Sequence, residues 1–225
     1  MNPGKRLLAA AAAVRENRLI VDVGTDHAYL PAYLILSGKT THCLAVDIGV
    51  GPLKNAEKTV EKYGLSDSVM LRISDGLQAV FPSEAEDITI CGMGGTLMTA
   101  ILKNCSWLQK DDLHLVLQPQ SHVWEVRAFL MRNGFCITQE SVLEENDKLY
   151  ITIEALYDGI DRTVSDGECY FGSLLHDTHP LAVRYTQERY RQAEIRFNAL
   201  KNAGMCNAET DFLAACIEYY NNRTD

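Results

Sequence analysis

The sequence lacks any run of about 18 apolar residues, the minimum for a membrane-spanning helix. Its seven cysteines are odd in number, widely spaced and include no CxxC pair. That pattern argues against a disulfide framework and a zinc site, and it indicates a reducing compartment, so we expect a cytoplasmic protein with no membrane partner. The apolar run Leu7–Val14 is short and followed by charged residues, which favours a helix of the mature protein over a signal peptide.

Several motifs of well-known enzyme sites are missing too. The chain has no complete GxGxxG fingerprint, no P-loop and no GxSxG nucleophile elbow. His176 and His179 have HxxH spacing, but no cluster of carboxylates or cysteines completes a set of metal ligands. We therefore expect no bound metal.

Basic residues are scarce. Lysine and arginine number 21 against 30 aspartates and glutamates, a net charge of −9, whereas nucleic-acid-binding proteins are usually basic. Two segments depart from this balance: residues 1–20 hold four basic residues against one acid, and residues 181–203 hold five against two. Each is either a solvated helix face or a contact surface for nucleic-acid phosphates, and both interpretations stay open.

The remaining composition is that of a globular protein, with 47% hydrophobic and 23% charged residues in a chain of 225. Short apolar runs predict strands at 19–23, 42–46, 69–73, 87–91 and 113–117. Helical patterns at 27–37, 51–63, 96–104 and 123–133 follow four of them, and Gly38, Gly64 and Gly134 end three of those helices. This alternation predicts an α/β fold with a doubly wound parallel sheet.

The end of this domain has a different pattern. Residues 135–143 and 149–157 both resemble strands, and the five residues between them are too few for a crossover helix, so the pair must be an antiparallel hairpin. A mostly parallel seven-stranded sheet that ends in such a hairpin is the layout of the Rossmann-like S-adenosylmethionine-dependent methyltransferase fold. We assign residues 1–157 to that domain. Residues 158–225 form a second unit: a linker to residue 179, then a coiled-coil-like helical hairpin of two helices, 180–203 and 207–222.

Ligands of open α/β sheets bind beyond the carboxyl ends of the strands, so the residues there are informative. Gly24 follows the first strand, which holds Asp22, and it allows a ligand to approach the backbone. Asp26 and His27 stand where a dinucleotide fingerprint has further glycines, which disfavours a pyrophosphate and points to a cationic or polar ligand. The alternative is that Asp26 caps the next helix and His27 packs beside it.

Acidic residues also follow the second and third strands. Asp47 could accept the hydroxyls of a ribose, and Asp75, before Gly76, could accept a hydrogen bond from an adenine amino group. Helix capping by Asp47 and an ordinary Asp-Gly turn are the alternatives. Together the three strand ends indicate a cofactor that contains adenosine.

Two further segments follow the fourth and fifth strands. The glycine-rich segment 92–95 implies a close backbone approach or a tight turn. Gln118 and Gln120 carry amides that could read the edge of a base or simply face solvent.

These segments together resemble a known family. DVGTDHAYLP (22–31), GPL (51–53) after Asp47, SDGL (74–77), ICGMGG (90–95) and LQPQ (117–120) look like the bacterial tRNA (adenine(22)-N1)-methyltransferase family, TrmK, and the resemblance extends over the whole chain. It implies a cytoplasmic enzyme that methylates N1 of adenine 22 in tRNA with S-adenosylmethionine, and we favour a monomer. Two positions depart from the family pattern: Ser74 replaces a glycine, and Gln120 replaces an asparagine and keeps its amide.

The resemblance also implies roles for individual residues. Asp26, His27 and Tyr29 would be catalytic. The substrate tRNA would contact Gln118, Gln120, Arg184, Arg189 and Arg191. The cofactor would contact Asp22, Gly24, Asp47, Ile48, Asp75, Gly76, Gly92, Met93 and Gly94.

Two other functions remain compatible with the sequence. The acidic net charge would suit a methyltransferase for small molecules, and the same fold could serve as a non-enzymatic regulator that binds a nucleoside. Salt-sensitive tRNA binding would exclude the first, and methyl transfer to bulk tRNA would exclude the second.

Overall fold

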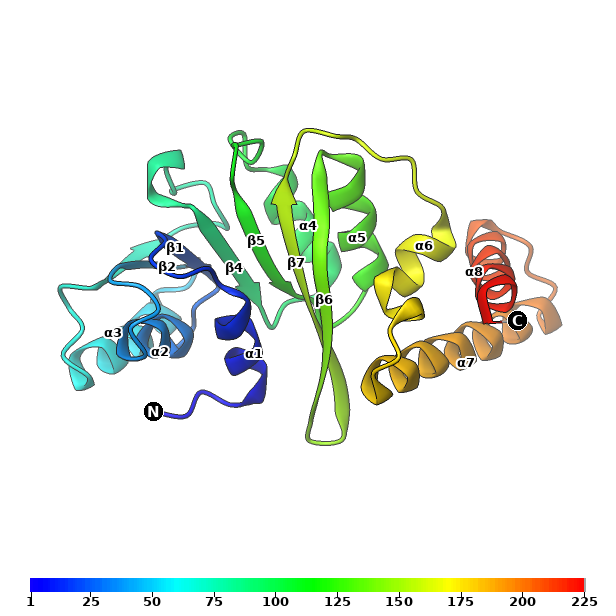
Figure 1. Cartoon of the computed structure of the whole chain (residues 1–225), viewed down its shortest axis with the longest axis horizontal. Helices are drawn as coiled ribbons and strands as arrows, with labels where there is room; N and C mark the ends of the chain where they lie inside the picture. The colour runs from blue at the N-terminus through cyan, green and yellow to red at the C-terminus, as the bar shows by residue number, and fades with distance from the viewer. Residues whose placement is uncertain (225) are drawn as a thin grey trace.

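The computed structural model describes residues 1–224 and contains a seven-stranded sheet (Figure 1). The strand order is β3-β2-β1-β4-β5-β7-β6. Five neighbouring strands are parallel, and the last two form an antiparallel hairpin at the edge, as the sequence predicts. The strands are β1 (Ile20–Val23), β2 (Cys43–Asp47), β3 (Val69–Ile73), β4 (Asp87–Cys91), β5 (His114–Gln118), β6 (Phe135–Glu145) and β7 (Lys148–Tyr157).

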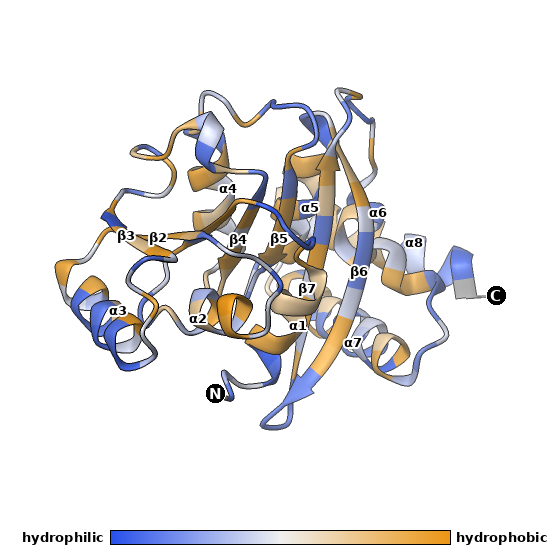
Figure 2. Cartoon of the chain, turned by 60° about the vertical axis from the view of Figure 1, so that its left-hand side comes forward, coloured by the Kyte–Doolittle hydropathy of each residue, from blue (hydrophilic) through white to orange (hydrophobic). Residues whose placement is uncertain are grey.

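Helices cover both faces of the sheet and bury an apolar core on each. On one face lie α1 (Lys5–Ala13), α2 (Tyr29–Leu36) and α3 (Val50–Lys62), and on the other lie α4 (Gly95–Lys103) and α5 (Val123–Arg132). The central strands β1, β4 and β5 are buried on both faces, which explains why most of their residues are apolar. The edge strand β6 is only partly buried, and Figure 2 shows hydrophilic and hydrophobic bands along it.

The terminal hairpin is longer than the sequence suggests. Glu145 pairs with Lys148, so only Asn146 and Asp147 form the turn, in place of the five residues that we expected. Both turn residues have positive φ, 51° and 59°, as a tight hairpin turn requires. The hairpin therefore extends past the carboxyl edge of the parallel strands, toward the start of α7 (Figure 1).

The helix after β1 begins later than predicted. We expected it to start at His27, but α2 starts at Tyr29 because Asp26 and Ala28 have positive φ, 44° and 51°. Ala28 is the N-cap residue and no side chain caps this helix. The interpretation of Asp26 as a helix cap is therefore wrong, and its carboxylate is left for another role.

The predicted linker 158–179 is not free of structure. It contains the helix α6 (Asp166–Phe171) and the 3-10 helix η2 (Gly172–His176). Ser165 and Glu168 form a reciprocal capping box at the start of α6, and the buried side chains of Phe171 and Leu174 attach the segment to the body of the protein. This Ser-x-x-Glu signal was visible in the sequence and was outweighed by the surrounding Gly, Asp, Ser and Thr residues.

The two predicted C-terminal helices are present as α7 (Pro180–Asn202) and α8 (Ala208–Thr224), while Asp225 lies outside the described residues. Their own core is small and includes Ala193, Leu200 and Leu213. The pair therefore packs on the main domain, where the Trp124 ring of α5 lies 4.8 Å from the Phe212 ring of α8.

Candidate functional site

A pocket of about 160 Å³ lies beyond the carboxyl ends of β1 and β4. Its lining combines five residues that the sequence singled out with four others. The five are Asp22, Gly24, Asp26, His27 and Tyr29, and the others are Leu7, Thr25, Leu30 and Cys91. Asp22 is buried and accepts a hydrogen bond from Thr89 Oγ1 at 2.7 Å. Burial raises the pKa of Asp22, and the hydroxyl of Thr89 opposes that shift.

Gly24 supplies the close approach that its position suggests. Its φ is 75°, and a Cβ atom at this position would collide with Cε of Met93. Its amide donates to Val46 O at 2.8 Å, which ties the turn after β1 to β2. Any larger residue would have to displace the end of the Met93 side chain and would be strained at this positive φ.

Asp26, His27 and Tyr29 stand together at the mouth of this pocket. Asp26 Oδ2 lies 3.5 Å from His27 Nε2, and both side chains are well exposed, at 62% and 40%. The rings of His27 and Tyr29 stack with 5.1 Å between centroids and 9° between planes. The segment therefore presents a carboxylate beside a flat aromatic surface, which suits a planar ligand with an amino group.

Asp47 lies at the adjacent strand end. Its Oδ1 accepts the amide of Gly49 at 2.8 Å, and its Oδ2 is 3.4 Å from the amide of Asp26, so the carboxylate keeps acceptor capacity for a ligand. Ile48 and Ile73, at the ends of neighbouring strands, are 68% and 55% exposed. An acid flanked by exposed apolar side chains fits a ribose joined to a base.

Asp75 also reaches this edge, because the amide of Ser74 donates to Asp47 O at 2.9 Å. The Asp75 side chain is exposed. Ser74 is buried, and its Oγ donates to Gly76 O and accepts from the amide of Ala79. The serine therefore stabilises the turn that carries Asp75.

The loops after β4 and β5 bind each other. Gln120 N donates to Met93 O and Gly95 N donates to Ser121 O, both at 2.8 Å. A Cβ at Gly95 would collide with His122 O and one at Gly94 would lie 3.0 Å from Ser121 Oγ, so these glycines serve loop packing. Gly92 and Met93 remain next to the pocket.

The prediction that Gln118 contacts the substrate is wrong. Gln118 is the last residue of β5, one position beyond the expected strand, and its side chain points into the protein with 1% exposure. Its Nε2 donates to Arg6 O at 3.0 Å and to Thr152 Oγ1 at 3.3 Å. It cannot read a base there.

Gln120 and Arg189 both line a second pocket, of about 340 Å³, between the loop after β5, the β6–β7 hairpin and α7. Arg191 is exposed on the same helix. Arg184 is bound to Glu144 at 2.6 Å and to Glu188 at 2.9 Å, so its charge is largely balanced within the protein. Sequence reasoning missed Lys148 and Tyr150 of this pocket, although an antiparallel last strand must begin at the carboxyl edge of its neighbour.

The basic N-terminal segment is not a free cationic surface. Arg6 pairs with Glu145, Arg15 with Asp87 and Asp112, and Arg18 with Glu86. These ion pairs neutralise much of the positive charge of residues 1–20, so the charge count of the sequence overestimates the charge available to RNA phosphates.

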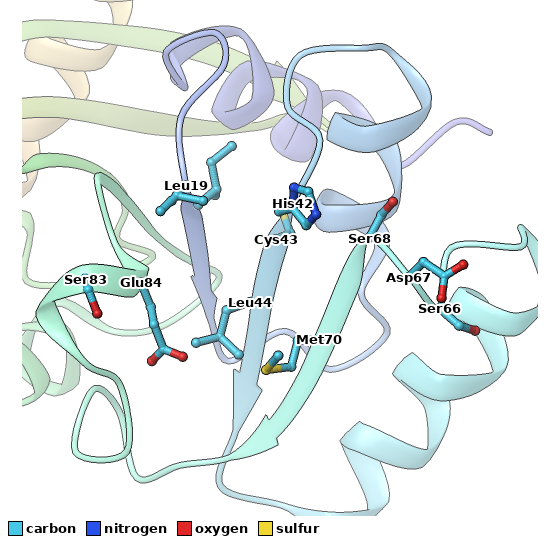
Figure 3. A pocket seen from close by; sticks show the side chains of 11 residues that line it. Leu19, His42, Cys43, Leu44, Ser66, Asp67, Ser68, Met70, Ser83 and Glu84 are labelled. Atoms are coloured by element: carbon cyan, nitrogen blue, oxygen red, sulfur yellow. The ribbon is translucent and has the colours of Figure 1, made fainter.

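A separate cavity of about 340 Å³ lies at the opposite, amino ends of β1 to β3. Figure 3 shows Leu44 and Met70 projecting into it from neighbouring strands, with Glu84 of η1 (Pro82–Glu84) on the other side. Its lining is mainly apolar, and ligands of such sheets bind at the other edge. We therefore place the functional site at the carboxyl edge.

Among residues 1–224, no group of three histidine, cysteine or acidic side chains is arranged to hold a metal ion. The same described helices include none with the length and apolarity that crossing a membrane requires.

Comparison with known proteins shows the family to which the chain belongs. Residues 4–153 match the family model described as "Methyltransferase domain". Over 167 residues the chain is 37% identical to the tRNA (adenine(22)-N(1))-methyltransferase of Bacillus subtilis, which covers 69% of this chain and 68% of that protein. The chain belongs to the bacterial tRNA (adenine(22)-N1)-methyltransferase family, TrmK.

Solved TrmK structures extend the match to the C-terminal helices. The crystal structure of B. subtilis TrmK has a TM-score of 0.89 and 28% identity, with 100% of this chain and 99% of that chain covered. A Streptococcus pneumoniae putative tRNA (m1A22) methyltransferase, solved with S-adenosyl-L-methionine, has a TM-score of 0.84 and 29% identity over 99% of each chain. The Rossmann-like methyltransferase fold and the helical pair α7–α8 therefore form one TrmK architecture.

Proposed function

We propose that this protein transfers a methyl group from S-adenosylmethionine to N1 of adenine 22 in tRNA. The observation that carries this function is the pocket in which Asp22, Gly24, Asp26 and His27 converge, within a chain that matches the TrmK structures along its whole length. We infer that the enzyme acts in the cytoplasm, where tRNA is found, and as a monomer, since one chain supplies all proposed site residues.

The described residues fit S-adenosylmethionine. We propose that Asp47 accepts the ribose hydroxyls and that Ile48 covers one side of the adenine, with Asp75 at its amino group. The remaining part of S-adenosylmethionine would be lined by Asp22, by the separate turns at Gly24 and Gly76, and by the segment 92–94. When bound, S-adenosylmethionine supplies a methyl group on a sulfonium sulfur.

We propose that Asp26, His27 and Tyr29 handle the target adenine. Adenine N1 carries a lone pair, so no strong base has to act, and the protein must chiefly hold N1 in line with the methyl group. The adenine becomes cationic as N1 gains the methyl group. An Asp26 carboxylate that accepts a hydrogen bond from the N6 amino group would stabilise that charge. His27, 3.5 Å from Asp26, would orient the carboxylate, and Tyr29 would extend the aromatic surface.

We propose that residues 1–157 carry out the reaction and that residues 158–225 hold the RNA. Arg189, Arg191 and, more weakly because of its ion pairs, Arg184 would contact phosphates from α7, with Gln120 nearer the target. The target base must leave its stack to reach the pocket.

Tritiated methyl transfer to unmodified tRNA, followed by nucleoside analysis, tests this function. The expected product is tRNA with N1-methyladenosine at a single position. Replacing adenine 22 by guanine should abolish its formation. A methylated small molecule without methylated tRNA, or binding of S-adenosylmethionine without any transfer, would contradict it.

A further inference from the structure

The second pocket has the size and chemistry of a nucleotide site. It lies between Gln120 and Ser121 after β5, Lys148 and Tyr150 at the start of β7, and Tyr185 and Arg189 of α7; we name it the flanking pocket. Its volume of about 340 Å³ falls within the range of small-ligand sites. Three segments far apart in the sequence form it, so it exists only in the complete fold.

Two polar groups in the flanking pocket lack partners. Arg189 Nε is buried and makes no hydrogen bond among the described residues, although its guanidinium lies 5.6 Å from the centroid of the Tyr185 ring. The amide of the exposed Gln120 side chain likewise has no partner within residues 1–224. A buried donor without a partner is costly, so the pocket is suited to an occupant that brings acceptors.

The charges of the pocket favour an anion. Lys148 and Arg189 are its basic residues, and Asp147 and Glu188 are its acids. Arg184 Nε binds Glu188 at 2.9 Å and so balances that acid, while Asp147 sits in the hairpin turn. The Arg6 guanidinium lies over one face of the Tyr150 ring, 4.9 Å from its centroid, so a base would stack on the opposite face. A base with its phosphate would satisfy these groups together.

The flanking pocket adjoins the proposed reaction site. Gln120 N donates to Met93 O at 2.8 Å, and Met93 lies directly over Gly24 at the first pocket. One loop therefore separates the two pockets. A single RNA strand whose target base enters the first pocket would bring its next nucleotide to the second.

We propose that the flanking pocket binds the nucleotide next to the target adenosine in the same tRNA. Gln120 hydrogen-bonds its base edge, Tyr150 stacks on the base, and Lys148 and Arg189 hold its phosphate. This inference rests on the proposed function and adds a determinant of which adenosine is chosen, since flanking contacts govern choice in enzymes that extrude a base.

A double-mutant cycle between protein and RNA tests this inference. Two tRNAs, each lacking the base on one side of the target, are compared with intact tRNA, using wild type and Gln120→Ala. Gln120 is exposed and its side chain makes no hydrogen bond to any residue that the structure describes, so the variant should fold, as a thermal melt will verify. Arg191→Gln is the matched comparison, because it removes a charge from α7 outside the flanking pocket.

On one of the two abasic tRNAs, wild type should lose roughly tenfold in kcat/KM, within the range expected for a lost base contact. On intact tRNA, Gln120→Ala should have a kcat/KM several-fold below that of wild type. On that abasic tRNA, the kcat/KM values of Gln120→Ala and wild type should be almost equal. Arg191→Gln should lower kcat/KM by the same factor on all three. If the effects of Gln120→Ala and of base removal on kcat/KM are additive for both abasic tRNAs, the proposed role of the flanking pocket is wrong, while the proposed function stays intact. Absence of methylation of intact tRNA by wild type would overturn both.

Discussion

Both edges of the sheet carry charged side chains, but their surroundings differ. At the amino edge, where β4 and β5 begin, the charges are bound to one another. Asp87 is fully buried and accepts hydrogen bonds from Arg15 N and Arg15 Nε, both at 2.8 Å, and it lies 3.0 Å from His114 Nδ1. Arg15 also contacts Asp112, which is 60% exposed.

At the carboxyl edge, the charges are open to a ligand. The Asp26 side chain is 62% exposed, and among residues 1–224 its carboxylate pairs with His27 alone. Asp47 binds backbone amides while keeping acceptor capacity. Arg189 Nε has no partner among the described residues. Charged residues that lack protein partners are candidates for ligand binding, whereas a cluster whose members bind one another contributes to the fold.

The largest expected effect comes from breaking the amino edge. Asp87→Ala should lower the free energy of unfolding by about 3–5 kcal/mol, because it leaves Arg15 and His114 without their buried partner. Urea denaturation measures this. Asp112→Ala removes the exposed partner of the same arginine and should cost less than about 1 kcal/mol. Both variants, where folded, should retain wild-type kcat, since this edge is remote from the reaction; a large loss of kcat at full stability would contradict the division between edges.

At the carboxyl edge, Asp26→Asn should lower the rate of methyl transfer and leave the stability of the fold unchanged. Turnover should fall by roughly a hundredfold, the size expected for loss of an electrostatic stabiliser of the transition state. The melting temperature and the affinity for tRNA should stay the same, because the side chain caps no helix and the change is nearly isosteric. Single-turnover methylation measures the rate, and a loss within about threefold would exclude this role for Asp26.

Asp47→Ala should weaken S-adenosylmethionine binding on the order of 1.5–3 kcal/mol, the value of a hydrogen bond to a charged group, and leave tRNA binding unchanged. Calorimetry measures both affinities. Asp67→Ala removes an exposed acid beside the cavity at the amino edge and is the matched control. Equal cofactor affinities in the two variants would contradict the assignment of Asp47.

Much of this arrangement was predictable from the sequence because it depends on local signals. Apolar runs and helix-ending glycines predicted all seven strands. The position of each motif after a strand predicted that Asp22, Gly24 and Asp26 lie together at the carboxyl edge. The fate of individual side chains depended on tertiary contacts. Gln118 and Gln120 differ by two positions, yet one ends β5 buried and the other is exposed. Arg189 and Arg184 share a helix, yet only Arg184 meets acids on a neighbouring strand and on its own helix.

The acid side of the stability curve offers a smaller test of the amino edge. Burial by itself would raise the pKa of Asp87, but hydrogen bonds with His114 and Arg15 bring it below its ordinary value of 3.8. A carboxyl group with a depressed pKa stabilises the fold above its ordinary pKa, and this contribution is lost as the pH falls through the folded value. Asp87→Asn should therefore flatten the loss of stability below about pH 4, measured as melting temperature against pH. An unchanged slope would show that other acids dominate.

The smallest expected effect concerns two cysteines at opposite edges. Cys43 begins β2 at the amino edge, and Cys91 ends β4 within the lining of the reaction pocket. Burial raises the pKa of both thiols, so each should react slowly with a thiol reagent at neutral pH, far more slowly than the exposed Cys206. Cys91 should be the faster of the two because it is only partly buried, whereas Cys43 is buried.

Only Cys91 should respond to the cofactor. Saturating S-adenosylmethionine should slow its modification without changing that of Cys43, and slow inactivation by the reagent should disappear in Cys91→Ser. Mass spectrometry of partially modified protein follows each site separately. If the cofactor protects both cysteines equally, it acts by stabilising the whole fold, and the partly exposed pocket at the carboxyl edge does not account for the reactivity of Cys91.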